Sequence, residues 1–205
     1  MKILITGFDP FGGEIINPSY EAVKLLLDVV SGAEIIKAEI PTVRGKALEV
    51  VKSKIEECNP DAVICVGQAG GANAVRIERI AINLDDYRFP DNEGNQPIDE
   101  PIYADGPNAY FSTLPIKAIR DAIIEKGIAA EVSNSAGLFV CNHVFYSIRH
   151  LCETRFRERN IISGFIHVPF IPEQTVDKPN EPSMPLEDIV TALKTAVEVI
   201  VANHE

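Results

Sequence analysis

The regular alternation of short apolar segments with longer amphipathic ones constrains the fold of this chain more than any other feature. Residues 2–6, 34–40 and 61–66 are runs rich in Ile, Val and other apolar residues, as expected for buried strands. Apolar residues recur at helical spacing in the segments that follow the first two runs. This alternation is typical of a mostly parallel or mixed sheet that helices cover on both faces.

The same patterns define the expected elements along the whole chain. We predict strands at 2–6, 34–40, 61–66, 75–84, 129–132 and 163–168. We predict helices at 18–30, 43–58, 114–126, 140–155 and 187–202, the first of them capped by Asn17. A length of 205 residues suits one hydrophobic core. We therefore expect a single α/β domain over residues 1–205, with an open twisted mixed or parallel sheet like those of phosphorylases and hydrolases.

One long segment, residues 85–113, interrupts this rhythm. It contains four prolines and several acidic residues, and its apolar residues follow no clear period. Loops of this length in a compact domain are usually functional lids, subunit contacts or disordered segments. The sequence does not decide among these three roles.

The charge and hydropathy of the chain exclude two classes of partner. The formal net charge is −11, and acidic residues dilute the densest basic stretch, at 155–159. Nucleic acids and anionic membranes require clustered Lys and Arg, so we expect neither as a partner. No apolar run approaches the ~20 residues that cross a bilayer, and the N-terminal run is too short for a signal peptide. We therefore expect a cytoplasmic protein.

The cysteines do not form a metal or disulfide pattern. The chain has four of them, Cys58, Cys65, Cys141 and Cys152, and none belongs to a Cys-x-x-Cys pair. Free thiols are expected in a reducing compartment, whereas a hyperthermophilic source would leave disulfides open. Cys141 and His143 are two residues apart on a predicted helix, so their side chains diverge. We expect no metal and no cofactor.

Cys141 stands at the start of the predicted helix 140–155. Free backbone N–H groups and the positive end of the helix dipole favour a thiolate there, and they can also hold an oxyanion. However, Phe145, Ile148 and Cys152 follow at helical intervals on the same face. That pattern also describes a buried structural cysteine, and periodicity alone favours this interpretation.

Two further residues complete a possible catalytic set. His167 ends the predicted strand 163–168, and ligands in open α/β sheets bind beyond the carboxyl ends of strands. A histidine there can exchange a proton with a thiol, or it can be a core residue bonded to backbone. Glu78 can orient the imidazole, or it can pair with Arg76 or Arg79 at the surface. Position alone does not separate the two interpretations of His167, and for Glu78 it favours the surface pair.

Long stretches of the sequence resemble the pyroglutamyl peptidase family of cysteine peptidases. The similarity includes the segments TGFDPFGG at 6–13, VGQAGG at 66–71, ERIAIN at 78–83, PDNEGNQP at 90–97, SAGLFVCNH at 135–143 and GFIHVPFIPEQ at 164–174. These ordered matches span nearly the whole chain and are much more specific than one short motif. The resemblance implies hydrolytic removal of an N-terminal pyroglutamyl residue from peptides.

The resemblance also implies roles for individual residues. The Glu-Cys-His triad of the family falls on Glu78, Cys141 and His167. By the same resemblance, the walls of the lactam pocket are formed by Phe8, Phe11, Thr42, Phe139 and Val140. Asn17 and Gln68 supply its polar contacts, and Arg88 lies near the oxyanion. A neutral lactam needs such apolar walls and few hydrogen bonds. The family is commonly tetrameric, which implies a homo-oligomer.

Two departures and two alternatives accompany this resemblance. Phe89 stands where the family often has a branched aliphatic residue, and the interval from Cys141 to His167 is slightly longer than usual. A nucleoside phosphorylase-like enzyme has a similar fold, but the Gly-rich turns lack the Lys-Ser/Thr of a phosphate loop. A non-catalytic binder of pyroglutamyl peptides is the other alternative, against which the intact triad argues.

Overall fold

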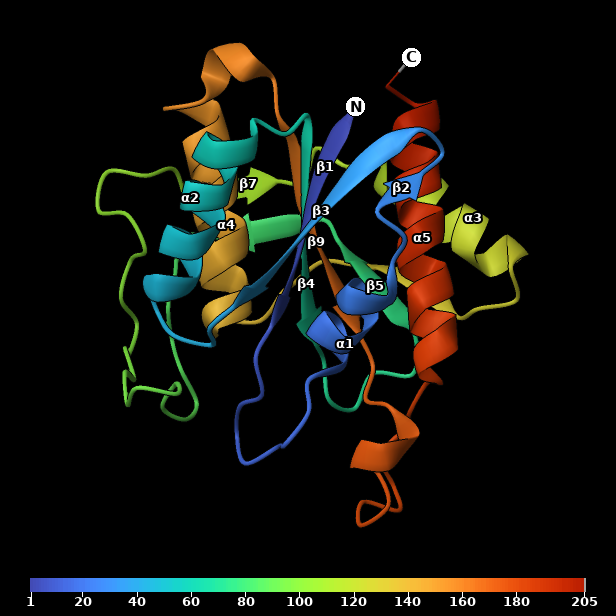
Figure 1. Cartoon of the computed structure of the whole chain (residues 1–205). Coiled ribbons are helices and arrows are strands. Elements are labelled where there is room, and N and C mark those ends of the chain that lie inside the picture. The colour runs from blue at the N-terminus through green and yellow to red at the C-terminus, as the bar shows by residue number, and fades with distance from the viewer. Residues whose placement is uncertain (205) are drawn as a thin grey trace.

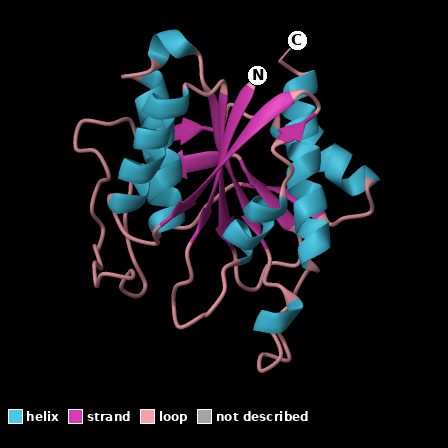
Figure 2. Cartoon of the chain, viewed as in Figure 1, coloured by secondary structure: helices cyan, strands magenta, loops and turns pink. Residues whose placement is uncertain are grey.

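The computed structural model describes residues 1–204 and contains one seven-stranded mixed sheet between two layers of helices (Figures 1 and 2). The strands are β1 (Lys2–Phe8), β2 (Val29–Val30), β3 (Ala33–Ile40), β4 (Ala62–Gln68), β5 (Val75–Glu78), β8 (Ala130–Ser133) and β9 (Ile162–Val168), with β6 (Ile80–Ile82) and β7 (Ala109–Phe111) in a separate pair. The helices are α1 (Pro18–Leu25), α2 (Lys46–Cys58), α3 (Ile116–Glu125), α4 (Val140–Glu153) and α5 (Leu186–Ala202), with short 3₁₀ turns η1 (Arg157–Arg159) and η2 (Pro172–Gln174). This confirms the predicted α/β class.

The strand directions determine where functional side chains can meet. The order in the sheet is β2-β3-β1-β4-β9-β5-β8. β3, β1, β4 and β9 are mutually parallel, so their carboxyl ends lie at one edge. β5 runs antiparallel to β9, and β8 runs parallel to β5. The sheet is therefore mixed, with its last two strands reversed.

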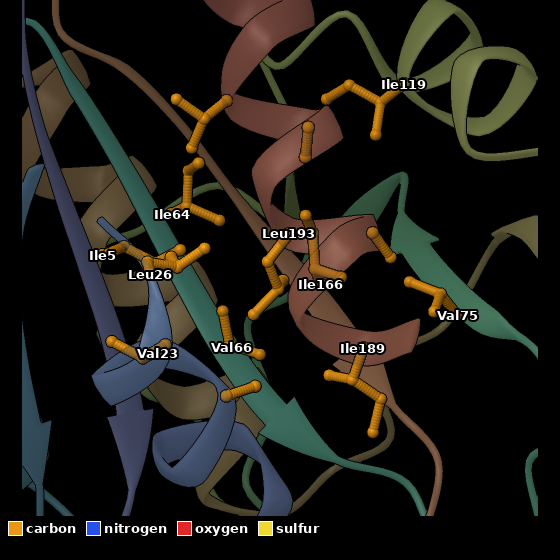
Figure 3. Close-up of a cluster of buried hydrophobic side chains, with 14 of the residues drawn as sticks. Ile5, Val23, Leu26, Ile64, Val66, Val75, Ile119, Ile166, Ile189 and Leu193 are labelled. Carbon is orange, nitrogen blue, oxygen red and sulfur yellow. The ribbon is translucent and has the colours of Figure 1, made fainter. Parts of the chain in front are cut away.

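Helices cover both faces of the sheet, as predicted. In Figure 1, α1, α3 and α5 lie on one side of the strands, and α2 and α4 lie on the other. Figure 3 shows the first of the two cores, where Ile5 and Ile64 of the sheet face Leu193 of α5. Leu4 and Phe165 point to the opposite core, which α2 and α4 cover. The alternation of side chains along each strand supplies both cores, and strands buried on both faces read as continuous apolar runs.

The predicted helix 18–30 is wrong in its second half. Asn17 caps α1 through its side chain as expected, but the helix ends at Leu25. Residues 29–30 instead form β2, because the left-handed turn at Ser31 and Gly32 (φ 49° and 80°) folds the chain back onto β3. Helical spacing of apolar residues continues through this segment by coincidence.

The predicted strand 75–84 is also wrong, because it is two strands in two sheets. The chain leaves the main sheet at Arg79, whose carbonyl accepts a hydrogen bond of 2.8 Å from the N–H of Ser112. β6 then pairs with β7, which lies inside the segment predicted to be irregular. Apolar residues on both sides of the bend conceal it in the sequence.

The long segment 85–113 is attached to α4 by buried polar groups. The carboxamide of Asn142 bonds to backbone groups of Ile82 and Leu84. Nδ1 of the neighbouring His143 lies 2.8 Å from a carboxylate oxygen of Asp85. Asp85 is fully buried and also forms an ion pair with Arg44. These contacts anchor the start of the segment directly beside Cys141.

Candidate active site

Cys141 lies in the first turn of α4, where the helix leaves backbone N–H groups without intrahelical partners. Phe139, the residue before the helix, occupies the N-cap position and makes no side-chain capping bond. The first helical bond is donated by the N–H of His143. The thiol is partly exposed. It therefore combines access to solvent with the positive end of a helix dipole.

His167 lies near the end of β9 and contacts both of the other predicted catalytic residues. Its Nδ1 lies 2.8 Å from Oε1 of Glu78. Burial by itself lowers the pKa of His167, but the interactions with the Cys141 sulfur and the Glu78 carboxylate outweigh it and raise the pKa to about 10. The structure thus brings Glu78, Cys141 and His167 together and favours a protonated imidazole between two acidic groups.

Glu78 reaches this cluster from a strand that runs in the reverse direction. In the antiparallel pair of β5 and β9, Glu78 lies opposite Phe165 and Arg76 lies opposite His167. Residues two apart share a face, so Glu78 and His167 are diagonal neighbours on the side of the sheet that α4 covers. Glu78 is fully buried, and its Oε2 has no hydrogen-bond partner within residues 1–204.

A glycine in β4 makes room for the thiol. Gly67 lies beside His167 in the parallel register of β4 and β9. A Cβ atom at Gly67 would lie 3.0 Å from Sγ of Cys141 and 2.8 Å from the ring of Phe165. Real Cβ contacts are rarely so short, so the Cys141 sulfur and the Phe165 ring can approach the strand only because this position has no side chain.

A cleft of about 770 Å³ opens over the three residues. All three belong to its lining, as do four of the residues to which the resemblance assigned substrate contacts: Phe11, Gln68, Arg88 and Phe139. One wall is aromatic. The ring of Phe139 packs against Phe11 at 5.9 Å and Phe89 at 4.8 Å between centroids. Phe89, noted above as a departure from the family, is therefore part of this wall.

The other four predicted pocket residues are buried and are not among those that line the cleft. Phe8 and Val140 belong to the hydrophobic core under it. Asn17 uses its carboxamide to cap α1 and to donate to the carbonyl of Asp9. The hydroxyl of Thr42 donates to the same carbonyl. None of these four residues lines the cleft, and their contact with substrate stays a prediction.

Several residues that line the cleft were missed in the sequence. They are Glu14, Arg76, Asp86, the segment Ser135–Leu138 and Phe170. Arg76 was interpreted only as a possible partner of Glu78, whereas its Nε bonds to Glu131 on β8 at 2.8 Å. The antiparallel register with His167 would have identified it, but that register depends on a strand reversal that the sequence does not signal.

Two features concern metals and membranes. Within residues 1–204, no group of three His, Cys, Asp or Glu side chains is arranged to hold a metal ion. No helix in that same range is long and apolar enough to cross a membrane.

Known proteins resemble this chain over nearly its whole length. A sequence model of the pyroglutamyl peptidase family matches residues 1–203. The pyrrolidone-carboxylate peptidase of Clostridium perfringens is 58% identical over 203 residues, which cover 99% of this chain and 94% of that protein. That of Fusobacterium nucleatum is 55% identical, covering 97% and 92% of the two chains.

Solved structures give the same result. Pyroglutamyl peptidase I from Bacillus amyloliquefaciens superposes with a TM-score of 0.94 at 50% identity and covers 97% of this chain and 94% of its own. A single-residue variant of the pyrrolidone carboxyl peptidase from Pyrococcus furiosus gives 0.95 at 47% identity, with both chains fully covered. Family match, sequence identity and fold coincide over the whole chain, and the chain therefore belongs to the pyroglutamyl peptidase family.

Proposed function

We propose that this protein is a cysteine peptidase that removes an N-terminal pyroglutamyl residue from peptides by hydrolysis. The observation that carries the proposal is the contact of His167 with both Cys141 and Glu78 at the base of the cleft. Family membership over the whole chain supports the same substrate. In this assignment Cys141 is the nucleophile, His167 the acid and base, and Glu78 the residue that orients the imidazole.

The reaction follows from this arrangement in two stages. The Cys141 thiolate attacks the pyroglutamyl carbonyl carbon, and the resulting oxyanion is stabilised by N–H groups of the first turn of α4 and by Arg88. The protonated His167 then gives its proton to the departing amine as the C–N bond breaks, which leaves a thioester on Cys141. Next, His167 takes a proton from water, whose oxygen attacks the thioester. Release of pyroglutamate restores the thiolate and imidazolium pair.

The cleft offers contacts that suit a neutral five-membered lactam. Phe11 and Phe139 supply flat apolar surface, and Gln68 supplies a carboxamide. We include Phe8, Asn17, Thr42 and Val140 as residues that support these walls. The aromatic walls themselves disfavour a charged α-amino group, because they offer it neither a hydrogen-bond acceptor nor a counter-charge. Selection against open-chain residues then arises from polar groups that they leave unpaired.

The substrate assignment predicts a clear order of reactivity. Purified protein should release the fluorophore from a pyroglutamyl amide and should react at least about 100-fold more slowly with the prolyl and glutaminyl amides, because each lacks part of the lactam. Fluorescence measured under identical conditions gives kcat/KM for all three. Equal rates would contradict the assignment, and phosphorolysis of inosine in a parallel assay would favour the phosphorylase-like alternative instead.

The raised pKa of His167 predicts an unusual pH dependence. A free histidine loses its proton near pH ~6.5, whereas His167, with its pKa raised to about 10, keeps the proton through neutral pH. We therefore expect kcat/KM to fall only as the pH approaches 10, where the acid that protonates the leaving amine is lost. The rate of Cys141 alkylation by iodoacetamide should not fall over that range, because it requires only the thiolate. An alkaline decrease in kcat/KM centred near pH 6.5 would contradict the ion pair.

We also propose a cytoplasmic homo-oligomer, with the tetramer that the resemblance implies. Exposed apolar side chains such as Phe111, Leu27 and Val29 are compatible with subunit contacts. Light scattering at several concentrations would determine the number of subunits.

A further inference from the structure

Gln174 is buried next to the cleft, and its carboxamide has only one possible orientation. Its Nε2 lies near three acceptors: Oε1 of Gln68 at 2.8 Å, a Glu14 carboxylate oxygen at 3.2 Å and the carbonyl of Ile16 at 3.3 Å. Its Oε1 accepts a bond from the N–H of Ile171 at 3.2 Å. A carboxylate and a carbonyl only accept, and a backbone N–H only donates. Rotating this amide by 180° would therefore oppose like groups at its contacts with Glu14, Ile16 and Ile171.

The fixed Gln174 in turn fixes Gln68. Because Nε2 of Gln174 donates to it, the group of Gln68 that faces Gln174 is its oxygen. The Nε2 group of Gln68 has no hydrogen-bond partner within residues 1–204, yet it is not among the buried atoms that lack one. Since Gln68 lines the cleft, this NH₂ group is accessible from the cleft. The cleft therefore presents a hydrogen-bond donor at Gln68, not an acceptor.

We infer that Gln174 is a positioning residue that sets the specificity of the cleft through Gln68. This inference rests on the proposed function. By holding Gln68 with its NH₂ group toward the substrate, Gln174 makes the cleft require an acyl group that carries an acceptor, such as the ring carbonyl of pyroglutamate. A prolyl ring lacks that carbonyl and leaves the donor unpaired. An unrestrained Gln68 would offer its oxygen as readily as its nitrogen.

The charges around Gln174 reinforce this orientation. Glu14, one of its acceptors, also forms an ion pair with Lys178. The Lys178 ammonium group lies 4.6 Å from the centre of the Phe170 ring, which lines the same cleft. The carboxylate of Glu14 is thus held as an acceptor, and charged acceptors form stronger hydrogen bonds than neutral ones. The NH₂ group of Gln174 thus donates to both Glu14 and Gln68.

The first test is Gln174→Met, which keeps the length of the side chain and removes both polar groups. We expect KM for the pyroglutamyl amide to rise about fivefold, the effect of losing one preorganised hydrogen bond, with kcat within about twofold. The preference for the pyroglutamyl over the prolyl amide should fall by a similar factor. The rate of Cys141 alkylation by iodoacetamide should stay unchanged, because the triad does not involve Gln174. Glu173→Gln, an exposed position in the same turn, is the matched control and should keep the wild-type KM.

A double-mutant cycle separates positioning from a general structural role. If Gln174 acts through Gln68, Gln174→Met should change KM less than about twofold in a Gln68→Met background. An equal change in both backgrounds would overturn the inference. If circular dichroism shows that Gln174→Met does not fold, Gln174→Glu replaces only the donor group and gives the same comparison. A wild-type protein without activity on pyroglutamyl amides refutes the proposed function, whereas an active wild type with an unchanged KM in Gln174→Met refutes this inference alone.

Discussion

Cys141→Ser is expected to lower kcat/KM for a pyroglutamyl amide at least about 1,000-fold, the scale of effect seen when a nucleophile is removed. The imidazole of His167 is already held as a cation by Glu78 and Cys141. A cationic imidazole suits a cysteine nucleophile, which can attack as a thiolate without giving up a proton in the same step. A serine hydroxyl does not ionise near neutral pH, so it would need a neutral imidazole as base, and this site disfavours that form.

The same substitution should leave the fold unchanged. Serine is nearly isosteric with cysteine, and position 141 is partly exposed, so we expect a melting temperature within about 2 °C of the wild type. Cys58→Ser is the matched control, because Cys58 is also half-buried but lies at the end of α2. It should retain full activity. Normal turnover by Cys141→Ser, or inactivation by Cys58→Ser, would exclude the proposed nucleophile.

Glu78→Gln is expected to reduce kcat/KM by about 100-fold or more. The carboxylate holds Nδ1 of His167 at 2.8 Å and is one of the groups that raise the pKa of the imidazole. A carboxamide can turn its NH₂ group toward Nδ1, which favours the wrong protonation state of the ring. The variant should therefore lose part of the ion pair as well as the orientation of the imidazole.

A pH profile distinguishes this effect from simple loss of structure. In Glu78→Gln, the alkaline decrease in kcat/KM should move to lower pH, because the pKa of His167 falls when a neighbouring negative charge is removed. Glu125→Gln, an exposed position at the end of α3, should change neither the rate nor the profile. Residual activity with an unshifted alkaline limb would show that Glu78 does not act on the imidazole.

The sequence is sufficient for most of the fold because most elements follow from local patterns. The strands β1, β3, β4 and β9 were each predicted as apolar runs, and α2, α4 and α5 from helical spacing. Both errors occurred where a bend leaves the apolar pattern intact. The turn at Ser31 and Gly32 and the bend at Arg79 are determined by pairing with distant strands. Such pairing has no local signature.

The candidate site was predictable where its residues lie at the carboxyl ends of parallel strands, because ligands of open α/β sheets bind there. His167 ends a central parallel strand, and Cys141 starts a helix above the same edge, so topology alone makes them neighbours. Glu78 lies on a reversed strand, and only its motif identified it. Arg76 was not identified for the same reason. The role of Gln174 depends on which way two carboxamides point, and contacts between residues 106 positions apart determine that.

β9 is an inner strand of the sheet, and among the described residues it is the last strand in chain order. β9 lies between β4 and β5. It therefore connects β5 and β8 to the other four strands of the described sheet. A nascent chain that lacks residues 162–168 has its Glu78 and its Cys141 but neither His167 nor the strand that brings the two halves together. We therefore expect peptidase activity to appear only after β9 has been synthesised.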